Sequence, residues 1–214
     1  MAVLTQSDIL DYVKRGELTF TPVLDAFQLQ AHAVDLRLGF KFLVPRLWHV
    51  SDSGREQLHM DYYAPIKRQH FDVVELKAGQ FFDLMPGEHI IVSSLESIRM
   101  PKDLMAVMYP RTSTNRKGLS VDQTGIIDCG YEGQLMIPVR NNTQHQTVRL
   151  YPGERFCQLV FEQLTAAVTA RKSRYHRRDL ADGVDVDALK NERDAEITLI
   201  QAGDIAKLKT DFGV

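Results

Sequence analysis

The sequence predicts an all-β fold, in the form of a sandwich, a jelly roll or a barrel, preceded by one short helix. Apolar and polar residues alternate over residues 34–44, a period of two that is typical of a strand with one buried face. Further short apolar runs follow, separated by turn sequences rich in glycine, proline and aspartate. With 214 residues, the chain is long enough for one domain with an appendage.

The first helix is expected between Thr5 and Gly16. Thr5 or Ser7 can cap its N-terminus, and Asp8 in the first turn suits the helix dipole. Gly16 is placed to end the helix. After the strand at 34–44, strands are expected at 71–76, 81–84, 89–94, 104–109, 134–140, 147–150 and 157–161.

Two parts of the chain lack a strand pattern. Residues 49–72 are polar and are expected to form a long surface loop. Beyond about residue 170 the sequence becomes basic, residues 187–195 are weakly helical, and the remainder has no strong pattern. We therefore predict a domain over residues 1–179 and a C-terminal arm or tail over residues 180–214.

Composition excludes several classes of protein. Lys and Arg number 26 against 28 Asp and Glu, so the net charge of −2 argues against bulk nucleic-acid binding but not against one small anion in a basic pocket. The two cysteines, Cys129 and Cys157, cannot build a disulfide framework or a zinc site, and a reducing, cytoplasmic setting is expected. Neither a signal peptide nor a membrane span is expected. The histidines do not have the spacing of a metal-binding motif, so no metal bound by protein side chains is expected.

The most informative stretch is residues 109–142. Arg111, Thr112, Ser113 and Arg116 supply guanidinium and hydroxyl donors at a turn, which suit phosphate oxygens. Taken alone, such a turn is better explained as a surface turn with solvated charges.

Residues 125–133 place a single carboxylate, Asp128, in a turn bounded by glycines. Such a carboxylate could orient and deprotonate a water molecule, and the glycines allow a ligand to approach the backbone closely. Alternatively, Asp128 is an Asx-turn residue of a hairpin.

The order of these motifs resembles the superfamily of trimeric dUTP diphosphatases (dUTPases) and dCTP deaminases. Similarity to the deaminase branch is carried by residues 7–10, 18–22, 30–39, 85–88, 98–101 and 111–119. Residues 125–141 and 152–159 look like the third and fourth motifs of dUTPases. The resemblance extends to about Arg178 and implies a distorted jelly roll of the dUTPase-like type and a homotrimer with shared active sites.

The resemblance also implies roles for single residues. Asp128 would activate water for attack on the α-phosphate, and Tyr131 would stack on the deoxyribose and exclude a 2′-hydroxyl. The expected phosphate ligands are Arg111, Thr112, Ser113, Arg116 and Gln158, with Lys172, Tyr175 and Arg178 as candidates from the basic segment after residue 170. Mg²⁺ would arrive bound to the triphosphate of a deoxypyrimidine nucleotide.

One position departs from the deaminase pattern. The strand residue that is a glutamate base in dCTP deaminases is Pro138 here, and proline cannot transfer a proton. The sequence therefore favours hydrolysis of dUTP to dUMP and pyrophosphate, although the glycine-rich C-terminal motif of dUTPases is missing. A dCTP deaminase, possibly bifunctional, is the first alternative, and a bulge that brings Glu132 or Asp122 to the base position would support it. A non-catalytic nucleotide-binding regulator is the second alternative.

Overall fold

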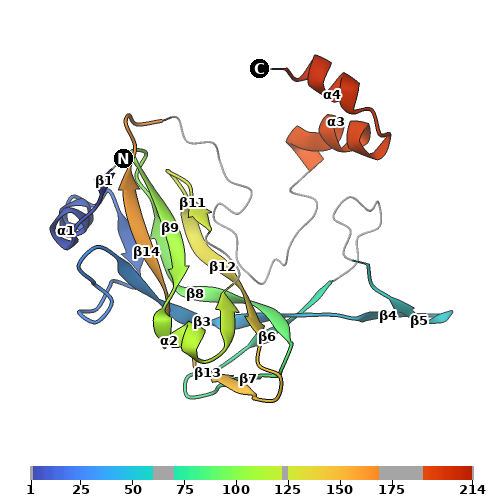
Figure 1. Cartoon of the computed structure of the whole chain (residues 1–214), viewed down its shortest axis with the longest axis horizontal. Coiled ribbons are helices and arrows are strands. Elements are labelled where there is room, and N and C mark those ends of the chain that lie inside the picture. Colours follow the sequence, from blue (N-terminus) through green and yellow to red (C-terminus); the bar gives the residue numbers. More distant parts are fainter. Residues whose placement is uncertain (1, 60–69, 122–124, 169–189, 214) are drawn as a thin grey trace. The chain divides into compact units, whose positions relative to one another are not determined.

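The computed structural model describes residues 2–59, 70–121, 125–168 and 190–213. The chain divides into two compact units, residues 1–45 with 71–181 and residues 46–70 with 182–214. The prediction of an all-β fold with a short N-terminal helix is confirmed by the first unit (Figure 1). Its elements are β1 (Ala2–Val3), α1 (Gln6–Lys14), β2 (Thr19–Thr21), β3 (Val34–Pro45), β6 (Phe71–Glu75), β7 (Phe82–Leu84), β8 (His89–Arg99), β9 (Leu104–Pro110), α2 (Thr112–Arg116), β10 (Leu119–Val121), β11 (Ile126–Ile127), β12 (Glu132–Asn141), β13 (Val148–Leu150) and β14 (Arg155–Gln163).

One large antiparallel sheet organises this unit. Its strands run in the order β10-β12-β8-β3-β14-β9-β11, with β1 added to β14, β2 to β8 and β6 to β3. A separate two-stranded sheet pairs β13 with β7. The large sheet curls (Figure 1).

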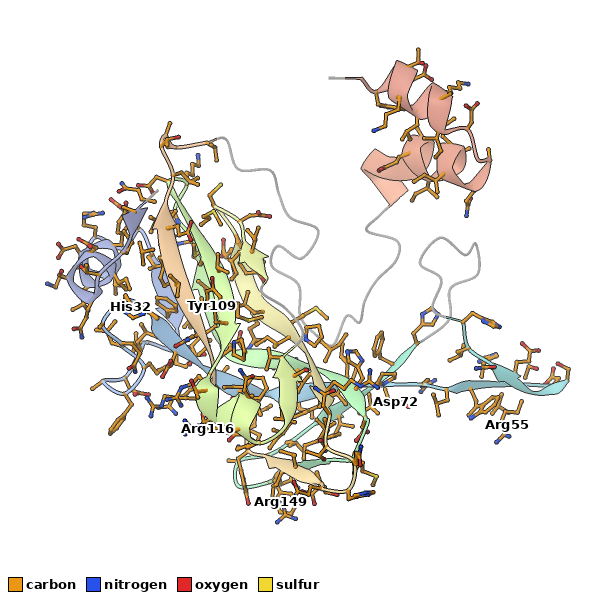
Figure 2. The ribbon with its side chains drawn as sticks, viewed as in Figure 1. His32, Arg55, Asp72, Tyr109, Arg116 and Arg149 are labelled. Atoms are coloured by element: carbon orange, nitrogen blue, oxygen red, sulfur yellow. The ribbon has the colours of Figure 1, made fainter. Side chains whose placement is uncertain are left out.

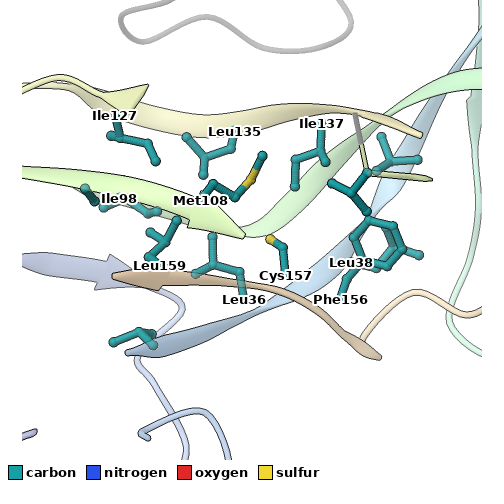
Figure 3. Packing of buried hydrophobic residues seen from close by; sticks show 14 of the residues in the cluster. Leu36, Leu38, Ile98, Met108, Ile127, Leu135, Ile137, Phe156, Cys157 and Leu159 are labelled. Carbon is teal, nitrogen blue, oxygen red and sulfur yellow. The ribbon is translucent and has the colours of Figure 1, made fainter. Parts of the chain in front are cut away.

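The core fills the inside of this curl (Figure 3). Leu36 and Leu38 of β3 and Leu159 of β14 are fully buried, and Ile137 of β12 is almost so. These side chains lie on alternate positions of their strands, as the period of two predicts. The alternation therefore marks the inward face of β12, whereas in β3 Asp35 and Leu43, at the other positions of the alternation, are buried as well.

Helix α1 begins as its sequence predicts. Thr5 Oγ1 accepts a hydrogen bond from the Asp8 backbone N–H at 3.4 Å, and the Asp8 carboxylate accepts one from the Thr5 N–H at 2.9 Å. The two bonds form a capping box, which satisfies donors that a helix N-terminus leaves open. Gly16 follows the helix with a positive φ of 70°, where glycine carries no steric cost.

The register of β8 breaks where it crosses its neighbours. Between Gln134 and Met136, two steps along β12 correspond to four steps along β8, from Ser97 to Ser93. On its other side, Leu38 to Phe42 of β3 faces only Ser94 to Val92 of β8. The extra residues bend both strands, and the bulge on β8 includes Glu96, which is buried.

The prediction of a surface loop over residues 49–72 is wrong for its first portion. Its first portion is a hairpin of β4 (Trp48–Ser51) and β5 (Gly54–Gln57), in which the Arg55 guanidinium lies 4.2 Å from the centre of the Trp48 ring. Nearly every residue of these strands is exposed, so the hairpin shows no alternation of apolar and polar residues. Residues 60–69 lie outside the described part of the chain.

The C-terminal segment contains two helices, α3 (Lys190–Gln201) and α4 (Ile205–Asp211). The expected weak helix at 187–195 is confirmed from residue 190 on, but it runs further, and α4 was not expected. The Asp204 side chain begins α4 by accepting a hydrogen bond from the Lys207 N–H at 3.0 Å. The boundary of a separate arm at residue 180 stays a prediction. Within the described ranges, no helix is long and apolar enough to span a membrane.

Candidate functional site

The predicted phosphate turn lies at the C-terminal end of β9. The Arg111 backbone N–H donates to the carbonyl of Phe156 at 3.2 Å, and the hydroxyl of buried Thr114 donates to the same carbonyl at 2.8 Å. These bonds fasten the turn to β14. Thr112, Ser113 and Arg116 are exposed on the short α2, as Figure 2 shows for Arg116. Buried contacts therefore hold a turn whose remaining polar groups face outward.

Gln158 lies at the same end of β9. It pairs across the sheet with Tyr109 of β9 on one side and with Asp35 of β3 on the other, and it is half-buried. The structure therefore brings Gln158 into the neighbourhood of Arg111, although more than forty residues separate them in the sequence, and their role as phosphate ligands stays a prediction.

A buried carboxylate supports this turn from beneath. Asp35 is 1% exposed, and its Oδ2 lies 3.1 Å from Arg111 Nε and 3.2 Å from Arg155 Nη1. Gln30 Nε2 also donates to this oxygen, at 3.3 Å. Burial raises the pKa of Asp35, and the two guanidinium groups act in the opposite direction without overcoming it.

A second buried carboxylate, Glu96 of the β8 bulge, fixes the segment before β3. Glu96 Oε1 accepts from Gln28 Nε2 at 2.6 Å, and Oε2 accepts from the backbone N–H of Arg37 at 3.0 Å. Gln28 Nε2 also donates to the carbonyl of Asp35 at 2.9 Å. Burial raises the pKa of Glu96, and these hydrogen bonds oppose that shift.

The other predicted group lies in the turn between β11 and β12. The side chain of Asp128 is exposed. Gly130, with a positive φ of 71°, donates its N–H to Pro101 at 3.0 Å, and the Met100 N–H donates to the carbonyl of Tyr131 at 2.8 Å. Backbone bonds therefore hold the turn against the start of β9 and leave the Asp128 carboxylate open to solvent.

Tyr131 is buried within its own chain, at 8% exposure. Its hydroxyl donates to the carbonyl of Gln134 at 2.6 Å, and burial raises the pKa of Tyr131 to about 12. The ring is therefore neutral and held in place at any physiological pH. Its role as the wall against a 2′-hydroxyl stays a prediction.

The two groups lie at opposite ends of β9. Ile127, next to Asp128, pairs with Ala106, whereas Arg111 directly follows the last residue of the strand. The six residue-to-residue steps from Met105 to Arg111 span about 20 Å at the usual rise of an extended strand. One chain therefore brings Arg111, Thr112, Ser113, Arg116 and Gln158 together, and brings Asp128 and Tyr131 together, but separates the two sets.

Pro138 lies on the half-buried face of β12, opposite Ile91 of β8. Because the extra residues of the register break belong to β8, β12 itself is regular, and Glu132 stays six residues, about 20 Å, from Pro138. The bulge that would bring Glu132 to the base position is therefore absent. Asp122, Lys172, Tyr175 and Arg178 lie outside the described residues.

Sequence reasoning missed the network beneath the turn, formed by Gln28, Asp35, Glu96 and Arg155. Asp35 falls on the polar positions of the alternating strand, which predicts exposure, but the segment before β3 covers it. The available signal in the sequence is that Asp35 lies between two apolar residues within residues 30–39, a segment that resembles the deaminase branch. Among the residues that the structure describes, no three His, Cys, Asp or Glu side chains gather as a metal site.

Comparison with known proteins assigns the class of this fold and site. A family model described as dCTP deaminase-like matches residues 3–164, and the chain belongs to this family of nucleotide-processing enzymes. The resemblance to the dUTPase and dCTP deaminase superfamily is thereby confirmed.

Two curated relatives are similar over most of their length, whereas the chain spans about half the length of a related solved structure. A protein of Dictyoglomus thermophilum named "dCTP deaminase, dUMP-forming" is 32% identical over 199 residues, which cover 89% of this chain and 98% of that protein. A protein of the same name from Dictyoglomus turgidum is 34% identical over 169 residues, covering 77% and 81%. A crystal structure of 2′-deoxycytidine 5′-triphosphate deaminase from Agrobacterium tumefaciens matches with a TM-score of 0.54 and 25% identity, over 74% of this chain and 48% of that chain.

These names contradict the sequence-based preference for a dUTP diphosphatase. Relatives that align with 77–89% of the chain are named as dCTP deaminases, so the first alternative is better supported. The preference rested on Pro138 and on the dUTPase-like motifs at residues 125–141 and 152–159, which the similarity to dCTP deaminases over 89% of the chain outweighs.

The raised pKa of Glu96 predicts a pH-dependent difference between the wild-type chain and Glu96→Gln. The folded state binds more protons than the unfolded state between the ordinary carboxyl pKa of about 4.3 and the raised value. Wild-type stability should therefore fall, relative to Glu96→Gln, as pH rises through this window. Urea unfolding of both proteins from pH 4 upward measures the difference. A difference that grows in favour of wild type with rising pH would show that the pKa of Glu96 is lowered instead.

Proposed function

We propose that the chain converts dCTP to dUMP, with loss of the amino group and of pyrophosphate. The observation that carries the proposal is the alignment with dUMP-forming dCTP deaminases over 89% of the chain and 98% of one relative. The network around Glu96 adds support, because it fastens residues 25–35, which contain part of the deaminase-like N-terminal half, onto the sheet.

The phosphates are proposed to bind at the turn that follows β9. Thr112, Ser113 and Arg116 are exposed there, and Arg111 and Gln158 lie beside them. Guanidinium and hydroxyl donors held by buried contacts suit phosphate oxygens because little ordering is needed on binding. Lys172, Tyr175 and Arg178 remain proposed additional ligands.

Asp128 is proposed to orient and deprotonate the water that attacks the α-phosphorus. Its carboxylate is exposed in a turn with tight backbone bonds, so it is accessible and held in position. Mg²⁺ is proposed to arrive with the triphosphate, where it would offset phosphate charge. The rigid ring of Tyr131 is the proposed sugar filter.

The assembly is proposed to be a homotrimer whose active sites each use residues of neighbouring chains. The separation of Asp128 from Arg111 by about 20 Å of strand supports this, because a single nucleotide would have to reach both ends of β9. If a second copy placed its β11–β12 turn beside the phosphate turn, Asp128 of one chain and Arg111 of the other could contact the same nucleotide.

Pro138 constrains the deamination step. Water must add to C4 of cytosine, and a proton must reach the departing ammonia, so the reaction needs a group that accepts and delivers protons. Pro138 and its strand neighbours Met136 and Arg140 supply no such base at neutral pH. We therefore expect deamination to be slower than it would be with a carboxylate at this position.

The products formed from dCTP test the proposal. Incubating the purified chain with dCTP and Mg²⁺ should release ammonia and pyrophosphate in equal amounts, with dUMP as the nucleotide product. Pyrophosphate and dCMP without ammonia would refute deamination. Binding of dCTP without either product would favour the non-catalytic nucleotide-binding regulator.

Restoring a carboxylate at position 138 should accelerate ammonia release. Pro138→Glu supplies a general base on the same face of β12, a contribution of about 10²–10⁴-fold in such reactions. Pro138→Gln is the matched control, since it has the same size but cannot take up the proton. The ammonia release rate from dCTP should rise for the glutamate variant alone. Equal rates in both variants would mean that the base acts from elsewhere.

A further inference from the structure

Two arginines share a single carboxylate oxygen at the phosphate end of β9. Arg111 Nε and Arg155 Nη1 lie 3.1 Å and 3.2 Å from the same Oδ2 of buried Asp35. One carboxylate therefore serves two guanidinium groups, which leaves a surplus of positive charge. Two neighbouring cations differ in this respect, because Arg37 and Lys117 each contact a carboxylate of their own, Asp25 and Glu154.

Both guanidinium groups retain unused donors. Arg155 Nη1 donates to Asp35 and, at 2.6 Å, to the carbonyl of Phe27, while its Nε and Nη2 contact no acceptor among the described residues. Arg111 Nε contacts Asp35, and Arg111 Nη1 donates to the carbonyl of Arg155 at 3.5 Å. Arg111 Nη2 has no acceptor among the described residues. The side chains of Arg111 and Arg155 are 26% and 29% exposed, so a ligand in solvent can reach them.

The geometry of the pair is fixed from several directions. Asp35 is held through the backbone by the Gln28 carbonyl, which accepts from the Asp35 N–H at 2.7 Å. Arg155 is tied to the segment before β3, and Arg111 to the strand that contains Arg155. Two guanidinium groups held in this way lose little side-chain entropy when an anion binds, and the fork of donors on each suits phosphate oxygens.

We propose that Arg155 is a second phosphate-binding arginine, paired with Arg111, and that Asp35 is the positioning residue that holds the two together. The ligand is a polyphosphate, which the proposed function supplies as the triphosphate of the nucleotide. Arg155 would contact phosphate oxygens through Nε and Nη2 while Nη1 stays on Asp35 and Phe27. The pair thus extends the phosphate turn from β9 onto the first residue of β14.

Binding of inorganic tripolyphosphate tests the pair without requiring turnover. Measured by calorimetry on the full chain, Arg155→Met should weaken tripolyphosphate binding by about tenfold or more, the loss expected when charged hydrogen bonds are removed. Arg149→Met is the matched control: this arginine binds an exposed carboxylate, Asp83, on the separate β7–β13 sheet, so the same change of charge should leave the Kd within about twofold.

Arg155→Lys keeps the proposal falsifiable if the methionine variant does not fold. Lysine keeps the charge but not the fork, so its Kd should fall between those of wild type and Arg155→Met. An unchanged tripolyphosphate Kd in a folded Arg155 variant, with a lowered Tm, would show that Arg155 stabilises the fold but does not bind phosphate. That result would overturn the inference. Weakened binding together with no ammonia release from dCTP would retain the pair and reject deamination, so the two failures are distinguishable.

Discussion

The length of β9 is the constraint on which the proposed site depends. The strand carries the phosphate turn at its C-terminal end, and the β11–β12 turn pairs back against its start, so Asp128 and Arg111 cannot converge within one chain. Both turns are held by backbone hydrogen bonds, at Phe156 on one side and at Pro101 and Met100 on the other. Neither can swing across the sheet without losing them, and under the proposed function a second copy would complete the site.

Buried carboxylates supply the rigidity at the phosphate end. Asp35 and Glu96 are each 1% exposed, and both receive hydrogen bonds or ion pairs from the segment before β3. A buried charge is costly without partners, so such groups tie together the elements that supply those partners. Here they tie β3, β8, β9 and β14 and the chain segment 25–30 into one support for the turn.

Local signals predicted the elements that depend on local physics. Helix α1 follows from its capping residues, and β3 follows from its alternation, because both patterns act over a few residues. The burial of Asp35 and the bulge at Glu96 depend on segments distant in sequence, so alternation alone predicts them wrongly or not at all. The β4–β5 hairpin is exposed on both faces and therefore carries no periodic signal. The functional preference was wrong because Pro138 and two dUTPase-like motifs were given more weight than the similarity to dCTP deaminases over 89% of the chain.

Mixed oligomers provide the most direct measurement of the shared site. One subunit type carries Asp128→Asn and the other carries Ser113→Ala with Arg116→Ala, so each chain lacks one of the two sets. Each variant alone should be inactive in pyrophosphate release from dCTP. In randomly mixed trimers, about a quarter of the sites would combine an intact Asp128 of one chain with an intact phosphate turn of another, and the activity should recover accordingly. Co-purified mixed oligomers with no recovered activity would show that both sets act within one chain, contrary to the separation imposed by β9.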